Sequence, residues 1–282
     1  MGERTDVWAI RALAVVLPGL LAWWVVAQGG SFDWRVVVCD VGQGSATVVR
    51  GGEQVAVIDA GPDNGRVLDC LADLGVQEVA AVFISHLDRD HVGGLGQLLT
   101  SLPVQRVLVS GAGQEQEDLA ELAATVPSHV PISALGAPAA VAVGDELVLR
   151  VVWPQQGSPA AEASANDGSL VLAANWPDGA AALIPGDIEA PVQGLLARSL
   201  DRAAFDVVVV PHHGSANFDE VFPDRLRPAV AVVSVGADNG YGHPVDRVLA
   251  TYEAAGAQVW RTDRAGNIAL AWNADAVLLD SW

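Results

Sequence analysis

The sequence predicts an α/β fold in which two mixed β-sheets pack together with helices on their outer faces, preceded by one N-terminal hydrophobic helix. Three observations indicate this fold. Many strand-like runs are apolar throughout, which is typical of sheets covered on both faces. Segments with helical spacing of apolar residues separate these runs. Hairpin-like blocks interrupt the alternation and divide the chain into two similar halves, each of which predicts one mixed sheet.

The chain begins with a hydrophobic segment. Residues 12–27 carry no charged side chain, and extension back to Val7 adds only Arg11. A helix of this length spans roughly 30 Å, which matches the hydrocarbon thickness of a bilayer. Length and flanking residues favour a membrane anchor over a secretory signal peptide, because residues 1–6 are not clearly basic. Arg4 and Arg11 precede the segment, so the positive-inside rule favours an extracellular position, in the cell envelope, for the remainder.

Residues 34–282 carry the patterns of a single domain, separate from the N-terminal region 1–33. Strands are predicted where apolar residues run between turns, and helices where they recur three or four apart, as Val67 and Leu71 do. Residues 155–167 have neither pattern and predict a long loop, of a length that is often functional. The expected strands span residues 35–41, 46–49, 54–59, 79–85, 146–153, 169–174, 180–185, 205–210, 229–235, 258–262 and 267–272, and the expected helices span residues 65–74, 93–101, 117–124, 190–200, a short stretch near 220, and 245–255.

Composition excludes some classes of protein. A hydrophobic fraction of 51% excludes a wholly disordered chain. The net charge is −19, and all 15 basic residues are arginines, so the chain is a poor non-specific binder of DNA or anionic lipid. Cys39 and Cys70 exclude a disulfide scaffold, and we expect two buried free thiols rather than a bridge.

The strongest chemical signal is the segment 85–94, with the sequence SHLDRDHVGG. His86, Asp88, Asp90 and His91 fall within six residues, directly after a predicted strand. Two imidazoles and two carboxylates so close together are costly without a counter-charge, and a bound dication removes that cost. This pattern predicts a metal site.

Other polar residues follow the ends of apolar strands. Asp59 ends one strand, Asp187 follows Pro185-Gly186, and His212-His213 follows the apolar run 207–210; His243 lies beyond a further strand. Each residue alone has a structural explanation, such as a turn cap. Their recurrence favours convergence at one edge of the sheets.

Together and in order, these motifs resemble the C-terminal metallo-β-lactamase domain of the ComEC family of competence proteins. The resemblance covers about residues 34–272 and implies an αββα sandwich. Two positions depart from the family's pattern: Ser45 stands where aspartate is common, and no lysine precedes His212. The family's multi-helix channel is also absent, so the chain is a split gene product, a fragment or a solitary hydrolase, and residues 1–33 are an anchor or match the last channel helix. The motifs are DVGQG at 40–44, HLDRDHVGG at 86–94, NDxS at 166–169, GD at 186–187, PHHGS at 211–215, GHP at 242–244 and TDxxG at 262–266.

The resemblance implies a role for each matching residue. These roles are metal ligation, orientation of the metal loop, charge stabilisation at the scissile group and, least specifically, substrate binding. His86 and Asp88 would bind one metal, Asp90 and His91 the other, Asp187 would bridge them, and His243 would complete the second site. Asp59 would orient the loop, His212 and His213 would face the scissile group, and Asp90 is expected to be catalytic with them. Asn166 and Ser169 would complete the first site or bind substrate, and Ser215 would bind substrate.

The resemblance also implies a function. Two divalent ions, Zn or Mn, would activate water in a nuclease that degrades the non-transported DNA strand during uptake. The partners would be that strand, the membrane through the N-terminal segment, and a separate channel protein. Two alternatives remain: a metallo-hydrolase of a small ester or phosphodiester, and a non-catalytic accessory domain. An open groove lined by arginines would favour DNA, for which the candidates are Arg89, Arg225, Arg247, Arg261 and Arg264.

Overall fold

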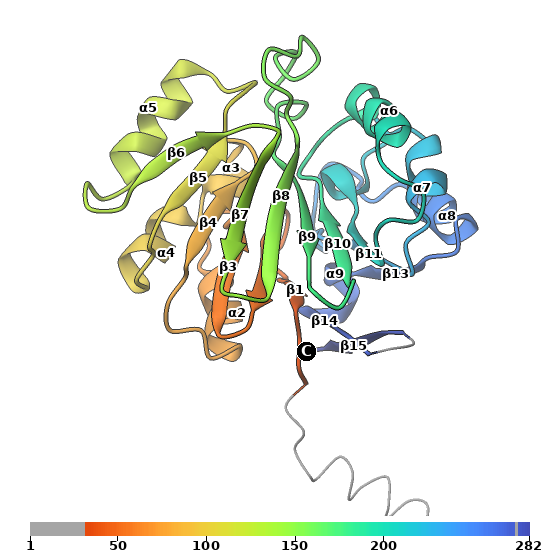
Figure 1. Ribbon diagram of the computed structural model, residues 1–282, viewed down its shortest axis with the longest axis horizontal. Coiled ribbons are helices and arrows are strands. Elements are labelled where there is room, and N and C mark those ends of the chain that lie inside the picture. Colours follow the sequence, from red (N-terminus) through yellow and green to blue (C-terminus); the bar gives the residue numbers. More distant parts are fainter. Residues whose placement is uncertain (1–31, 274–275) are drawn as a thin grey trace, which may run out of the picture. The chain divides into compact units, whose positions relative to one another are not determined.

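A computed structural model of the chain describes residues 32–273 and 276–282 (Figure 1). The predicted N-terminal hydrophobic helix lies outside these residues. Within them, no helix has both the length and the hydropathy that a membrane span requires.

Two mixed β-sheets form the centre of the described domain, as predicted. The first has eight strands in the order β15-β14-β1-β2-β3-β4-β5-β6, and the second has seven in the order β13-β12-β11-β10-β9-β8-β7. The first sheet comprises β1 (Val36–Val38), β2 (Thr47–Gly51), β3 (Gln54–Ile58), β4 (Ala81–Ile84), β5 (Val107–Ser110), β6 (Ile132–Leu135), β14 (Ile268–Trp272) and β15 (Val277–Ser281), and the second comprises β7 (Ala139–Val143), β8 (Leu147–Trp153), β9 (Val171–Asn175), β10 (Ala181–Ile184), β11 (Val207–Val209), β12 (Val230–Val233) and β13 (Gln258–Arg261).

Helices cover the outer face of each sheet, which completes an αββα arrangement (Figure 1). The helices α2 to α5 lie on the side of the first sheet, and α6 to α8 lie on the side of the second. Their bounds are α2 (Arg66–Asp73), α3 (Arg89–Val92), α4 (Leu95–Ser101), α5 (Gln116–Thr125), α6 (Ala190–Ser199), α7 (Val221–Leu226), α8 (Asp246–Ala254) and α9 (Thr262–Ala265), with a 3₁₀ turn η1 at Pro211–Gly214.

The apolar strands fill two cores at once because successive side chains point to opposite faces of a strand. In β10, Ala182 and Ile184 face the core between the sheets. Ala181 and Leu183 face the second core, beneath α6 to α8. Continuous apolar runs therefore reflect burial on both faces, as the sequence pattern predicted.

Four strands were missed by the sequence analysis: β5, β6, β7 and β15. All four are only four or five residues long, and β7 (AAVAV) is rich in alanine, which has low β-propensity. Helix α5 separates β6 from its partner β5, whereas β7 and β15 pair with the adjacent strands β8 and β14. Pairing in the sheet rather than local preference defines these short strands. The predicted loop 155–167 is described throughout and consists of turns and irregular backbone.

The expectation of two free thiols is wrong. Cys39, directly after β1, and Cys70, on the buried face of α2, form a disulfide with a Cα–Cα distance of 6.0 Å. The two residues are 31 positions apart, and only the packing of α2 beside β1 brings them together.

Candidate metal centre

The site forms where parallel strands end. β3 and β4 run parallel in the first sheet, and β10 and β11 run parallel in the second. Asp59 follows β3, the segment 85–94 follows β4, Asp187 follows β10, and His212-His213 follows β11. The predicted convergence of these residues at one edge of the sandwich is therefore what the structure has.

The DVGQG loop (40–44) packs directly against the segment 85–94. Ser45 N donates a hydrogen bond of 3.1 Å to Asp90 O, and Ser234 Oγ donates one of 2.8 Å to Gly44 O. Gly44 has a φ of +136°, and a Cβ at this position would collide with the Asp90 carbonyl. Only glycine allows this close approach, which places the backbone of Asp90.

Five side chains form a compact cluster of metal-ligand types, which we call the donor cluster: His86, Asp90, His91, Asp187 and His213. One group of potential ligands is His86, His91 and Asp187, and a second is Asp90, His91 and His213. His91 Nε2 lies 3.3 Å from Asp187 Oδ1, and His213 Nε2 lies 3.3 Å from Asp187 Oδ2. Asp187 thus lies between the two imidazoles. Asp90 Oδ2 is 3.4 Å from His213 Nε2.

Hydrogen bonds at Nδ1 orient all three imidazoles of the donor cluster. His91 Nδ1 donates to Asp59 Oδ2 at 2.8 Å, and His213 Nδ1 donates to the Ser234 carbonyl at 2.9 Å. Ser85 Oγ gives its proton to Asp59 Oδ2, so it accepts from His86 Nδ1 at 3.1 Å. With Nδ1 occupied, each ring presents Nε2 to the cluster.

His86 supplies the observation that tests whether a metal fits. Its side chain is fully buried, and its Nε2 has no hydrogen-bond partner. Asp88 Oδ2 lies 3.5 Å from this nitrogen, beyond hydrogen-bonding distance. A buried nitrogen without a partner is costly unless a ligand satisfies it. The donor cluster, with Asp88 beside it, therefore fits a divalent cation, which binds imidazole and carboxylate.

Ion pairing determines protonation in the cluster. Burial alone would raise the pKa of Asp187, but His213 and His91 hold it well below its usual value. Burial alone would lower the pKa of His91, but Asp187 and Asp59 raise it well above its usual value. The pKa of His213 rises to about 9 for the same reason, through Asp187 and Asp90. A cation that binds these nitrogens displaces their protons.

Ser85 and Glu189 are site residues that the sequence analysis missed. Ser85 is fully buried and links Asp59 to His86. Glu189 Oε1 lies 3.5 Å from His212 Nδ1. Their positions held a signal, because Ser85 directly precedes the HLDRDH segment and Glu189 follows Asp187 by two residues.

Two further histidines, His212 and His243, lie beside each other next to the donor cluster. The ring centroids of His212 and His243 are 5.7 Å apart, and His212 Nε2 is 4.0 Å from Asp187 Oδ2. His213 thus lies among the potential ligands, where the sequence analysis expected His243. The role of His243 as a ligand stays a prediction. Burial and the neighbouring His212 and His213 lower its pKa.

The three residues expected to bind substrate lie in different environments. Ser169 is fully buried; its Oγ accepts a 3.1 Å hydrogen bond from Asp187 N and lies 3.4 Å from His86 Nδ1. It therefore helps to orient Asp187 and His86 in the donor cluster. Ser215 is also buried, and its Oγ accepts from Asn217 N. Asn166 is half-buried and contacts Glu189 Oε1 at 3.4 Å.

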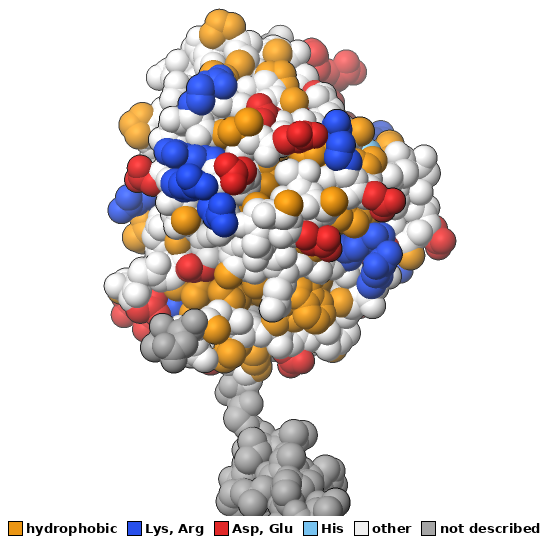
Figure 2. Space-filling model, turned by 90° about the vertical axis from the view of Figure 1, so that its right-hand side faces the viewer, with side chains coloured by type: hydrophobic (Ala, Val, Ile, Leu, Met, Phe, Trp, Pro, Cys, Tyr) orange, Lys and Arg blue, Asp and Glu red, His pale blue; other side chains and the backbone are white. Residues whose placement is uncertain are grey.

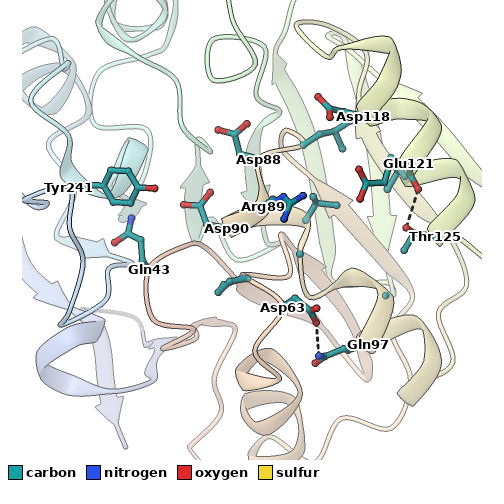
Figure 3. Close-up of a pocket in the computed structure, with 16 residues that line it drawn as sticks. Gln43, Asp63, Asp88, Arg89, Asp90, Gln97, Asp118, Glu121, Thr125 and Tyr241 are labelled. Carbon is teal, nitrogen blue, oxygen red and sulfur yellow. Dashed lines mark hydrogen bonds between the residues drawn. The ribbon is translucent and has the colours of Figure 1, made fainter.

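A groove of about 1060 Å³ lies beside the donor cluster (Figure 3). The carboxylates of Asp88 and Asp90 lie at its centre, α5 forms one side, and Tyr241 with Gln43 forms the other. Its acidic lining comprises Asp63, Asp88, Asp90, Asp118 and Glu121.

The groove in the described residues is not lined by several arginines. Of the five candidate arginines, all in the described part of the chain, only Arg89 lines this groove. Arg247 lies 3.5 Å from Glu220, and Arg261 pairs with Asp263 at 2.6 Å. On the face that α6 to α8 form, basic and acidic side chains are interspersed (Figure 2).

The fold and the donor cluster agree with the family that the sequence matches. The family model described as "Metallo-beta-lactamase superfamily" matches residues 39–218, well over half of the chain. The chain belongs to this superfamily. The crystal structure of the metallo-beta-lactamase fold protein YhfI from Bacillus subtilis shares the fold, with a TM-score of 0.52 and 11% identity over 87% of this chain and 99% of that one.

Two curated relatives are longer proteins, and part of each is similar in sequence to this chain. ComE operon protein 3 of Bacillus subtilis (strain 168) is 31% identical over 69% of this chain and 25% of its own length. The uncharacterized protein YcaI of Escherichia coli (strain K12) is 27% identical over 99% of this chain and 35% of its own length. The first similarity agrees with the resemblance to ComEC-type competence proteins. The chain thus spans about a quarter to a third of these relatives.

Proposed function

We propose that this superfamily member is a metal-dependent phosphodiesterase that cleaves DNA and degrades the non-transported strand during DNA uptake. One observation carries the proposal: His86, His91 and His213 direct Nε2 toward Asp90 and Asp187 at the ends of three strands, β4, β10 and β11. Such a set can hold two neighbouring cations, and paired cations suit phosphodiester hydrolysis.

We assign the ligands from the contacts. In keeping with the resemblance, His86 and Asp88 would hold one ion and Asp90 and His91 the other, with Asp187 beside both. We add His213 to the second ion, because its Nε2 lies within 3.4 Å of both Asp90 and Asp187. Zn²⁺ and Mn²⁺ both suit this mixture of imidazole and carboxylate ligands. When bound, such ions polarise a phosphoryl group and lower the pKa of a coordinated water.

The chain's own residues prepare the site for a phosphodiester. Asp59 and Ser85 fix the rings of His91 and His86, so that little reorientation is needed when substrate binds. His212, which is one-fifth exposed beside Asp187, can donate to an oxygen of the scissile group.

The cellular role rests on the curated relative and on the disulfide. ComE operon protein 3 is, by its name, a product of the ComE operon, which agrees with the resemblance to the ComEC family of competence proteins. A disulfide between buried cysteines is typical of proteins that fold outside the reducing cytosol. Both support a domain in the cell envelope, and we propose that residues 12–27 anchor it there next to a separate channel protein.

A direct test uses the full chain loaded with Mn²⁺ or Zn²⁺. We expect hydrolysis of single-stranded DNA and of bis(p-nitrophenyl) phosphate, with bound metal measured by mass spectrometry. Asp187→Asn keeps the size of the side chain but removes the charge, and it should abolish both metal uptake and hydrolysis. Equal cleavage by the two proteins would refute the mechanism, and a wild type that takes up no metal would support a non-catalytic accessory domain.

A second function has one observation in its favour. Three acidic residues (Asp63, Asp118 and Glu121) line the groove away from the donor cluster and oppose a long polyanion. A small ester or phosphodiester would meet less repulsion there. Hydrolysis of bis(p-nitrophenyl) phosphate without cleavage of DNA would favour this function.

A further inference from the structure

Tyr241 is a large side chain in an unusual position. It lines the groove beside the donor cluster, yet 73% of its surface is exposed, more than that of any other large hydrophobic side chain in the described residues. An exposed aromatic ring beside a catalytic site contributes nothing to the core. Such rings commonly serve as contact surfaces for ligands.

The ring is held in place from behind. It stacks on the imidazole of His243, with centroids 5.9 Å apart and an interplanar angle of 14°. Asn239 fixes the same loop, because its Nδ2 donates to the carbonyls of Gly236 and His243, and its Oδ1 accepts from His243 N. One face of the tyrosine ring is thus supported, and the other is available to a ligand.

The two sides of the groove differ in charge (Figure 3). Tyr241 and Gln43, on one side, are uncharged, whereas Asp118 and Glu121 project from α5 on the other. A phosphodiester whose phosphate lies at Asp88 and Asp90 is repelled by the α5 side. Its neighbouring nucleoside therefore fits best on the Tyr241 side.

We propose that Tyr241 stacks on the nucleobase next to the scissile phosphate and is the substrate-binding residue that selects nucleotide phosphodiesters. This proposal rests on the proposed phosphodiesterase function. Stacking is tolerant of base identity because every base has a π-face, so the contact suits an enzyme that degrades DNA of any sequence.

The test is a cycle of enzyme and substrate variants with the Mn²⁺-loaded full chain. Tyr241→Ala should raise KM for a single-stranded oligonucleotide about 5- to 100-fold, with a small change in kcat. Tyr241→Phe keeps the ring and should retain the wild-type KM. An oligonucleotide with abasic sites should bind the wild type as weakly as the normal oligonucleotide binds Tyr241→Ala, and the alanine variant should not discriminate between them.

Controls separate stacking from a structural effect. Val221→Ala removes another exposed side chain, 60% exposed on α7, and should leave KM unchanged. Two results would overturn the proposal while the phosphodiesterase function stands. One is an equal KM for wild type and Tyr241→Ala on the normal oligonucleotide. The other is a rise in KM on the abasic oligonucleotide that is the same for the alanine variant as for the wild type. A wild type that hydrolyses no phosphodiester would overturn both.

Discussion

At the scale of single residues, Asp59 has the most consequential position outside the donor cluster. It is fully buried with a φ of +60°, and it accepts hydrogen bonds from Ser85 N, Ser85 Oγ and His91 Nδ1. Asp59 therefore fixes the orientation of two imidazole rings, that of His91 directly and that of His86 through Ser85. The sequence analysis predicted this role, and the structure places the residue where it can perform it.

Replacing Asp59 tests this control. Asp59→Asn loses the acceptor for His91 Nδ1, and we expect metal affinity to fall about 10- to 100-fold. Affinity is measured by competition with a chelator. Ser85→Ala should show a smaller loss of metal affinity. It tests the same hydrogen-bond network if the Asp59→Asn variant does not fold. Asp63→Asn, at a groove residue that contacts Gln97, is the matched control; a loss of affinity there equal to that of Asp59→Asn would contradict the prediction.

The raised pKa of His213, about 9, predicts how pH affects the chelator-treated protein. The folded pKa lies above the unfolded value near 6.5, so the stabilising pairing with Asp187 is fully present below pH 6.5. It is lost as pH rises through 9. The melting temperature should fall across this window, whereas metal affinity should rise because the proton leaves. A His213→Gln variant should show a flatter profile; an unchanged slope would assign the effect to other groups.

At the scale of elements, the strands determine where the ligands lie and the loops determine how they point. Asp187 follows Gly186, whose φ is +59°. A Cβ added at this position would collide with Ser85 and Ser169. The turn after β10 therefore requires glycine, and this close approach brings the two sheets' ligands together. Strand-end positions were readable from the sequence, but this contact between the sheets was not.

The helix α5 supplies the acidic side of the groove, and its charges are testable. Asp118→Asn/Glu121→Gln should lower KM for DNA roughly two- to fourfold at about 10 mM salt, because two repulsive charges are removed. The effect should disappear at high salt. Asp145→Asn/Glu146→Gln, in the exposed turn before β8, changes the net charge equally and should not alter KM. Equal effects of the two double variants would show that only the net charge matters.

At the scale of the whole molecule, the Cys39–Cys70 disulfide ties the first sheet to α2 and borders the DVGQG loop. Cys39 precedes Asp40, which accepts hydrogen bonds from Gly42 N and Arg66. The link constrains the unfolded chain as well as the fold. Its stabilisation is expected to be about 3–4 kcal/mol for a loop of this length.

Removing the disulfide tests its contribution. Cys39→Ala/Cys70→Ala should lower the free energy of unfolding by about this amount in urea titrations. A reducing agent should destabilise the wild type similarly and leave the double variant unchanged. Equal stability of both proteins under oxidising conditions would show that the link contributes nothing.

The net charge of −19 also belongs to this scale. Asp88, Asp90 and Asp187 are candidate ligands whose charges bound dications would offset, so the total overstates the repulsion that a phosphate meets there. The remaining acids in the groove still limit how much DNA binding this chain supplies, which fits capture of DNA by other components.

The sequence by itself determined the double layer of sheets, the edge at which the site forms and four of the five donor-cluster residues as candidate ligands. These follow from local patterns: apolar runs define buried strands, and strand ends locate the polar residues. Only the tertiary structure decided the disulfide, the entry of His213 into the donor cluster beside Asp187, and the acidic lining of the groove. Each of these depends on residues far apart in the chain. Strand ends predict the edge at which such residues gather, but which of their side chains come within a few ångströms of one another depends on packing.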